Sequence, residues 1–225
     1  KVKDLFKSLG DLELAAYMTG IVQGTMGVEK RNNRQGDRTD ASASIDLEIG
    51  APITEASRAF IELQAGAGDG LDGEIPTFAG LNGDADNDPN VRFTEAWYEH
   101  EFMDGAIVFT AGHVDMTNYF DLNEVANDEN SQFLSGGFVN NAAIEFPDDN
   151  GFGMRLDYDI SDLWSVGFGY ADANGDWDNV TDDVFLIGEV RCRPEIKGRQ
   201  GNYRVSVWYN RSEHQDFQDP GNDQC

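Results

Sequence analysis

The chain has 225 residues, with 42 acidic against 16 basic side chains and a formal net charge of −26. This charge excludes nucleic acid as a partner, because phosphates would be repelled, and it excludes a polybasic role at a membrane surface. Hydrophobic residues make up 40% of the chain and aromatic residues 11%, so the composition is that of a folded protein rather than a disordered one.

The N-terminal part of the chain contains one predicted strand, between two segments of other character. Residues 1–10 form a separate segment with one amphipathic turn. They contain no visible signal peptide, so we expect either a cytoplasmic protein or a mature or trimmed form. Residues 12–28 are rich in Gly, Thr and apolar residues and predict a strand, whereas the entirely polar residues 29–40 predict a loop.

Strict alternation of apolar and polar residues predicts the next strands. Residues 41–49 and 58–65 alternate, with a short connection around Pro52 between them. A long acidic and glycine-rich loop covers residues 66–90. Residues 91–102 and 106–114 then predict two strands joined by a tight turn at residues 103–105.

Residues 112–147 form the longest segment without clean alternation. This segment is rich in Asp, Asn and Gln, with aromatic residues interleaved. Connections of this length usually have a function in a folded domain. Amides and carboxylates beside aromatic rings suit sugars, whose hydroxyls need hydrogen bonds and whose C–H faces pack on rings. The alternative is a solvated loop with a small apolar anchor.

Four further strands are predicted at residues 152–160, 164–170, 184–191 and 203–210, which makes about nine in all. The connections between successive strands alternate between long and short. Long loops at one end, short turns at the other, and one apolar face per strand are typical of transmembrane β-barrels. Aromatic residues at the ends of the apolar face fit an interfacial girdle. A soluble β-sandwich with one wet face per sheet would also alternate, but it would not explain the loop lengths.

A central motif comprises residues 115–121, 123–127, 132–134, 138–141 and 144–147. Further stretches go with it at residues 94–98, 112–115, 151–158, 201–205 and Trp208. Together these stretches resemble the carbohydrate-selective porin family (OprB type). The resemblance implies a 16-stranded outer-membrane barrel that passes sugars by diffusion. Residues 11–225 would then form a partial barrel, with an inward-folding loop at residues 115–147.

Nine strands are about half of such a barrel. An open sheet cannot lie in lipid, because the polar backbone groups at its edges would have no partners. The chain is therefore either the N-terminal part of a longer one, or other chains complete the barrel. We expect a transmembrane, all-β, antiparallel up-and-down barrel.

Candidate residues for lining a pore come from the central segment and from the polar face of the strands. They are Asp115, Asn118, Asp121, Asn123, Asn127, Asn130, Gln132, Asn141, Glu95, Trp97, Glu99, Arg155, Arg204 and Trp208. Opposed charges are a common selectivity device in pores, and the two tryptophans have faces on which sugar rings can stack. The alternatives are plain pairing between strands and packing against the inward-folding loop.

Asp84, Asp86 and Asp88 have the spacing of a short calcium-binding turn, since carboxylates at alternate positions can converge on one cation. The alternative is a solvated acidic loop, and residues 172–178 are a weaker case. No catalytic motif stands out, so we expect no enzyme and no required cofactor, with Ca²⁺ as the one candidate ion.

The sequence thus predicts a porin of the bacterial outer membrane for passive diffusion of small hydrophilic solutes, with carbohydrates foremost. Its partners would be small sugars, ions, outer-membrane lipid and, in a homo-oligomer, copies of itself. The alternatives are a calcium-stabilised β-sandwich that binds glycans, and a structural envelope protein without transport. Counting crossings places Cys192 and Cys225 at opposite ends of the strands, so we expect no disulfide between them.

Overall fold

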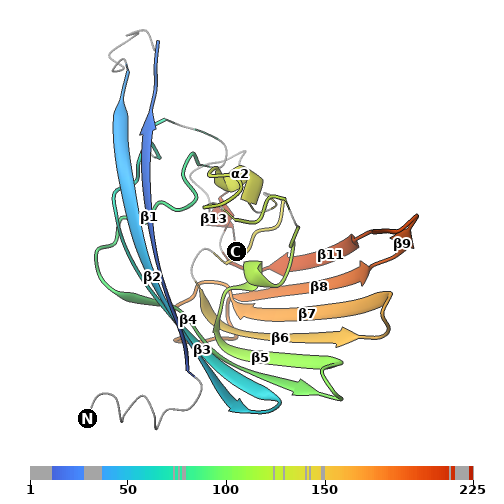
Figure 1. Cartoon of the computed structure of the whole chain (residues 1–225). Helices are drawn as coiled ribbons and strands as arrows, with labels where there is room; N and C mark the ends of the chain where they lie inside the picture. The colour runs from blue at the N-terminus through green and yellow to red at the C-terminus, as the bar shows by residue number, and fades with distance from the viewer. Residues whose placement is uncertain are drawn as a thin grey trace.

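Alternation places nine strands side by side in one curved antiparallel sheet (Figure 1), as a computed structural model of the chain describes. The residues that it describes are 12–27, 37–72, 74–75, 77, 80–123, 125–128, 130–139, 141, 143–147, 150–212, 214–215 and 223–224. The predicted N-terminal segment 1–10, most of the loop 29–40 and Cys225 lie outside the described residues.

The strands of the sheet follow one another in chain order. They are β1 (Glu13–Gly24), β2 (Thr39–Thr54), β3 (Ser57–Ala67), β4 (Arg92–Phe102), β5 (Ile107–Val114), β6 (Gly151–Asp159), β7 (Trp164–Asp172), β8 (Val184–Cys192) and β11 (Tyr203–Asn210). Each strand pairs with the next in antiparallel register, so within the described residues the sheet is an up-and-down meander without crossovers. Because these strands form one sheet and not two packed sheets, the alternative of a β-sandwich is wrong.

Short helices and two-residue strands lie between or after the main strands. A 3₁₀ helix, η1 (Met116–Asn118), and a short helix, α2 (Gly136–Val139), lie between β5 and β6. Two minor hairpins are formed by β9 (Glu195–Ile196) with β10 (Arg199–Gln200), and by β12 (His214–Gln215) with β13 (Asp223–Gln224). No helix among the described residues is long and apolar enough to cross a membrane.

The lengths of the connections confirm the predicted asymmetry. The connections after β1, β3, β5 and β7 are long, whereas those after β2, β4 and β6 are short and the one after β8 is of medium length. The turn after β4 holds Met103, Asp104 and Gly105 at positive φ angles, as a tight turn requires. All long loops therefore lie at one end of the sheet.

One strand boundary differs from the prediction. β2 runs through Pro52 to Thr54, where a short connection was expected around Pro52, and its pairing with β3 shifts register between Pro52 and Thr54. Proline has no N–H to donate to the ladder and is accepted in strands at such irregularities. The alternation of apolar and polar residues therefore stops at Pro52, whereas the strand continues to Thr54.

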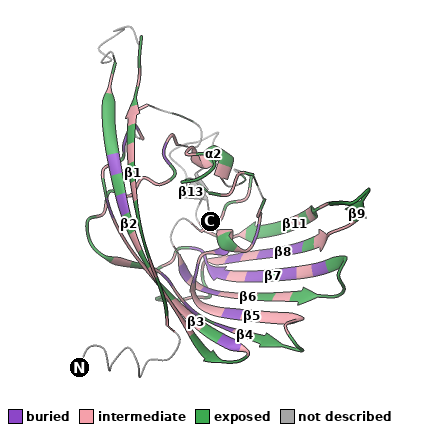
Figure 2. Cartoon of the chain, in the orientation of Figure 1, coloured by how far each residue is buried: buried purple, intermediate pink, exposed green. Residues whose placement is uncertain are grey.

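The sheet has two faces of opposite character. The outer face carries apolar side chains that are exposed to the surroundings, among them Met18, Ile45, Tyr98, Leu156, Trp164, Phe168, Val190, Tyr203, Val205, Val207 and Tyr209. Buried residues alternate with more exposed ones along strands such as β7 and β8 (Figure 2). The inner face carries the alternate residues, which are mostly polar, and the segment between β5 and β6 lies against it. A soluble protein does not leave so much apolar surface exposed, whereas a barrel strand in lipid requires it.

Candidate functional site

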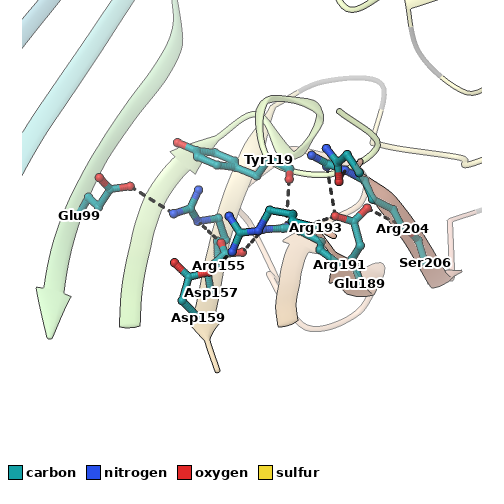
Figure 3. Close-up of polar contacts among 11 residues, drawn as sticks. Glu99, Tyr119, Arg155, Asp157, Asp159, Glu189, Arg191, Arg193, Arg204 and Ser206 are labelled. Atoms are coloured by element: carbon teal, nitrogen blue, oxygen red, sulfur yellow. Dashed lines mark hydrogen bonds and ion pairs between the residues drawn. The ribbon is translucent and has the colours of Figure 1, made fainter. Parts of the chain in front are cut away.

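A row of charged side chains crosses the inner face from Arg58 on β3 to Arg204 on β11, and Figure 3 shows it from Glu99 onward. On the β4 side, Glu99 accepts from Arg58 Nε at 2.8 Å and lies 3.5 Å from Arg155 Nη2. Arg155 Nε lies 2.8 Å from Asp157, and Asp157 lies 2.6 Å from Arg191 Nη1. Positive and negative groups therefore alternate along the row, and each has at least one opposite neighbour.

Glu189 on β8 is the most enclosed member of the row and links it to Arg204 on β11. The Glu189 carboxylate contacts Arg191 on its own strand, accepts a hydrogen bond from Ser206 Oγ at 2.9 Å, and lies 3.3 Å from Arg204 Nη1. The side chain of Glu189 is fully enclosed. A buried carboxylate with such partners is costly to disturb, because removing one member leaves another charge uncompensated.

The segment between β5 and β6 begins with η1, which docks on the inner face beside this row. Asp115 caps η1 by accepting from Thr117 N at 2.8 Å, and Asn118 Nδ2 donates to Glu95 on β4 at 2.8 Å. The Tyr119 ring lies 4.0 Å from the Arg155 guanidinium carbon, and Arg191 donates to the Tyr119 carbonyl at 3.3 Å. Polar contacts thus join the segment to both sides of the inner face.

Two apolar side chains of this segment fit where the strands carry glycine. Phe120 is fully buried, and a Cβ added at Gly169 would lie 2.7 Å from its ring. A Cβ added at Gly153 would lie 2.7 Å from the Met116 methyl group. Since real Cβ atoms do not approach so closely, the missing side chains on β6 and β7 are what allow the segment to lie against the sheet.

The remainder of the segment bonds mainly to itself. Asn123 N donates to Asn127 Oδ1 at 2.8 Å, Asn127 N donates to Gln132 Oε1 at 2.6 Å, and Asn141 N donates to Asp121 Oδ2 at 2.7 Å. These amides and carboxylates shape the segment. Among the residues of this segment that were predicted to line a pore, Asp115 and Asn118 contact a strand of the inner face, since both donate to Glu95 on β4.

A polar cavity of about 570 Å³ lies between this segment and strands β2 to β4. Its described lining includes the carboxylates of Glu48, Glu62, Glu95 and Asp115, and it includes no Lys or Arg. Asn118 and Asn127 also line it, so the cavity joins several predicted residues into one site. Hydroxyl-rich or cationic solutes match such a lining.

A second loop, residues 68–91, also lies on the inner face, which the sequence did not predict. Asn82 Nδ2 donates to Ser42 Oγ on β2 at 2.8 Å, and Gln23 Nε2 on β1 donates to the Leu81 carbonyl at 3.1 Å. This loop contacts the segment between β5 and β6, which we call the η1 segment, since Gly83 N donates to the Leu134 carbonyl at 2.6 Å. Two segments far apart in the sequence therefore cover the inner face together.

The carboxylates predicted to bind calcium contact protein groups, and Asp86 and Asp88 both lie within 3.9 Å of Arg92. Asp84 accepts from Ser44 Oγ at 3.1 Å, Asp86 pairs with Arg92 at 2.6 Å, and Asp88 accepts from Asn90 N at 2.9 Å. Burial raises the pKa of Asp84, whereas the Asn90 N–H lowers the pKa of Asp88. Among the described residues, no three acidic, His or Cys side chains lie ready to hold a metal ion. Calcium binding here stays a prediction.

The two predicted tryptophans differ in exposure. Trp208 on β11 is 37% exposed, opposite Ile187. Trp97 is only 8% exposed, donates to Glu95 Oε2 at 2.9 Å and stacks on Phe60 with 5.0 Å between ring centres. Sequence reasoning missed Phe60, Tyr119, Glu189 and Arg191, although Glu189 and Arg191 lie two residues apart in the predicted strand 184–191 and therefore on one face of it.

Comparison with known proteins supplies three likenesses. The family model described as carbohydrate-selective porin, OprB family, matches residues 30–224. An uncharacterized protein from Aquifex aeolicus (strain VF5) is 32% identical over 111 residues, which are 49% of this chain and 32% of that protein.

Two structures of Pseudomonas putida OprB share the fold. The high-pH structure is 17% identical with a TM-score of 0.66, over 95% of this chain and 55% of that one. The low-pH structure is 14% identical with a TM-score of 0.55, over 94% and 58%. The chain thus spans about a third of the length of its relative and just over half that of the solved structures.

Proposed function

Because this chain belongs to the carbohydrate-selective porin family (OprB), we propose that it forms part of an outer-membrane channel through which small carbohydrates diffuse passively. Membership of a porin family points to a channel and not to an enzyme. The bacterial outer membrane, with its lipid against the outer face of the sheet, is the compartment that this proposal requires. Assembly into a homo-oligomer stays a prediction.

One observation carries the proposal: the sheet exposes apolar side chains on its outer face and encloses charged ones on its inner face. Phe168, Val190 and Val205 are exposed on one side, whereas Glu95, Glu99 and Glu189 are buried on the other. A water-soluble protein has the opposite arrangement. Lipid outside and a polar passage inside account for both faces.

The segment between β5 and β6 would narrow the passage. Its docking against the charged row and against Gly153 and Gly169 supports a fixed constriction, since the contacts are close and Phe120 is fully buried. The site of solute discrimination would then be the polar cavity between this segment and strands β2 to β4. Carboxylates and amides in its lining can exchange hydrogen bonds with sugar hydroxyls as a solute passes.

Liposome swelling tests the proposal. Full-length protein in liposomes should admit monosaccharides quickly and trisaccharides slowly, because the covered inner face leaves a narrow passage. Protein carrying a deletion of residues 125–131 should admit trisaccharides faster. Swelling no faster than in protein-free liposomes, from protein that has folded into the bilayer, would instead support a structural envelope protein without transport.

A further inference from the structure

Two cavities on the inner face meet at one aromatic side chain, Phe60. The first is the cavity of about 570 Å³ beneath the η1 segment. The second, of about 520 Å³, lies nearer the short turn after β2 and is lined by Gly50, Pro52 and Arg58 among others. Phe60 and Glu48 line both cavities. A solute that moves along this side of the inner face therefore passes the Phe60 ring.

The Phe60 ring is held from behind by a second ring. It stacks on Trp97 with ring centres 5.0 Å apart and planes 24° apart. Trp97 is fixed in turn, because its Nε1 donates to Glu95 Oε2 at 2.9 Å and the Arg58 guanidinium lies 5.1 Å from its ring centre. Phe60 is thus a preorganised apolar surface within a polar passage, with one face packed.

The β2 side of Phe60 is open because its direct partner there is Gly50. No backbone constraint explains this glycine, since Gly50 is not among the residues with positive φ. Packing does not require it either, because an added Cβ would meet Glu13 at 3.5 Å, an ordinary contact distance. The missing side chain leaves space beside the ring.

Polar side chains line the two cavities on either side of the ring. Glu48 is shared by the two cavities, Glu62 and Asn118 lie on the η1 side, and Arg58 lies on the other side. A pyranose has an apolar C–H face that packs on an aromatic ring, and a rim of hydroxyls that bonds to carboxylates, amides and guanidinium groups.

We propose that Phe60 is the platform of a pyranose-binding subsite between the two cavities. The subsite deepens the proposed function and rests on it. Transient binding at Phe60 would favour ring-shaped sugars over acyclic polyols of the same size, because an acyclic chain presents no flat C–H face. Trp97 is a positioning residue in this account, since it holds the Phe60 ring without lying in the passage.

Single-channel recording of the full-length protein in planar bilayers tests the subsite, with glucose as the pyranose probe and sorbitol as the acyclic control. Phe60→Ala should raise the glucose concentration for half-maximal block of ion current about five- to tenfold, the effect of losing one aromatic contact. Phe60→Tyr keeps the ring and should stay close to the unmodified protein. Block by sorbitol should be weak and equal in all three proteins.

Gly50→Val provides a second variant that keeps Phe60 and Trp97 intact. It should weaken the glucose block by filling the space beside the ring. Equal glucose block in Phe60→Ala, Gly50→Val and the unmodified protein, with sugar still entering liposomes, would overturn the subsite and leave the proposed function standing. Absence of sugar entry in the unmodified protein would overturn both.

Discussion

The two halves of the inner face use charge differently. In what we call the paired half, on β6, β8 and β11, Arg155, Asp157, Glu189, Arg191 and Arg204 form a continuous row of ion pairs. In the acidic half, on β2 to β4 with the start of the η1 segment, Asp46, Glu48, Glu62, Glu95 and Asp115 are joined by no ion pair among the described residues. Glu95 and Asp46 accept from amides instead. The pair of Arg58 and Glu99 on β3 and β4 belongs to the row of the paired half.

Both halves follow the same alternation, so the difference comes from which side chains the register sets opposite one another. Arg204 faces Arg191 across β8 and β11, and Glu189, two residues along β8, pairs with both. Asp157 is the second anion of Arg191, so the two positive and two negative charges balance. Glu62 faces Glu95 across β3 and β4, and no basic side chain of the described ranges forms an ion pair with either. The paired half therefore holds the η1 segment through balanced charges, whereas the carboxylates of the acidic half accept hydrogen bonds from neutral groups.

The largest expected effect is that of breaking the paired half at Glu189. Glu189→Gln should lower the free energy of unfolding by about 3–5 kcal/mol, because Arg204 is left partly buried without its anion and Arg191 keeps only Asp157. Urea unfolding of the protein folded into lipid bilayers measures this. Glu62→Gln in the acidic half is the matched control. It should change the stability by less than about 1 kcal/mol, since it removes a charge that lies near other carboxylates.

The next largest loss of stability is expected when a methyl group is added where the η1 segment packs against β7. Gly169→Ala places a Cβ 2.7 Å from the Phe120 ring and 2.8 Å from Ile187, and we expect a destabilisation of about 1–3 kcal/mol. Gly188→Ala on the outer face is the control, since its nearest contact would be Val207 at 3.9 Å.

A double variant gives this prediction its decisive test. Phe120→Leu should recover part of the stability lost in Gly169→Ala, because the smaller side chain makes room for the methyl group. The free energies of the four proteins form a double-mutant cycle. Strict additivity would mean that Phe120 does not hold the segment against β7.

A smaller effect is expected on ion selectivity, and it should come from the acidic half. The double variant Glu48→Gln, Glu62→Gln should reduce the preference for cations over anions in reversal-potential measurements, by an energy on the order of 1 kcal/mol or less, since charges act weakly in a wet passage. The reduction should be greatest at low salt. Asp104→Asn in the turn after β4 should leave the preference unchanged. An unmodified channel that prefers anions would mean that Arg155 and its neighbours dominate the narrowest point.

The smallest expected effect concerns how loop 68–91 is held on β2. Burial raises the pKa of Asp84, helped by Asp46 and Asp86 and opposed by the hydrogen bonds from Ser44 and Asn130. Because the pKa is higher in the folded state, protonation favours the docked loop. This stabilisation is complete below the ordinary aspartate pKa of about 4 and is lost as pH rises through the raised value.

Hydrogen exchange of loop 68–91 should therefore be slower at pH 4 than at pH 7, after correction for the intrinsic rate. The free energy of opening of the loop, derived from these rates, should be higher at pH 4 by a few tenths of a kcal/mol up to about 1 kcal/mol. Asp84→Asn should remove this pH dependence. A loop that is equally protected at both values in the unmodified protein would show that Asp84 does not hold it.

Much of the fold could be predicted from the sequence because strand alternation is a local property. The face of the sheet on which residues such as Phe168 and Gly169, or Val205 and Arg204, lie follows from their position in the alternating pattern alone. The loop lengths then distinguish the strand order of a barrel from that of a sandwich. The boundary at Pro52 could not be predicted, because pairing with β3 carries β2 past a residue that locally reads as a breaker.

The sequence by itself determined the nine strands, their faces, the turn at residues 103–105 and the polar character of the η1 segment, since each depends on neighbours along the chain. Only the tertiary structure decided that Phe120 lies against Gly169, that Trp97 lies behind Phe60 and that loop 68–91 covers β2. These contacts join residues far apart in the chain, and their energies depend on distances and burial that no local pattern encodes. The separation of paired from unpaired charge on the inner face has the same origin, because it is set by register between strands.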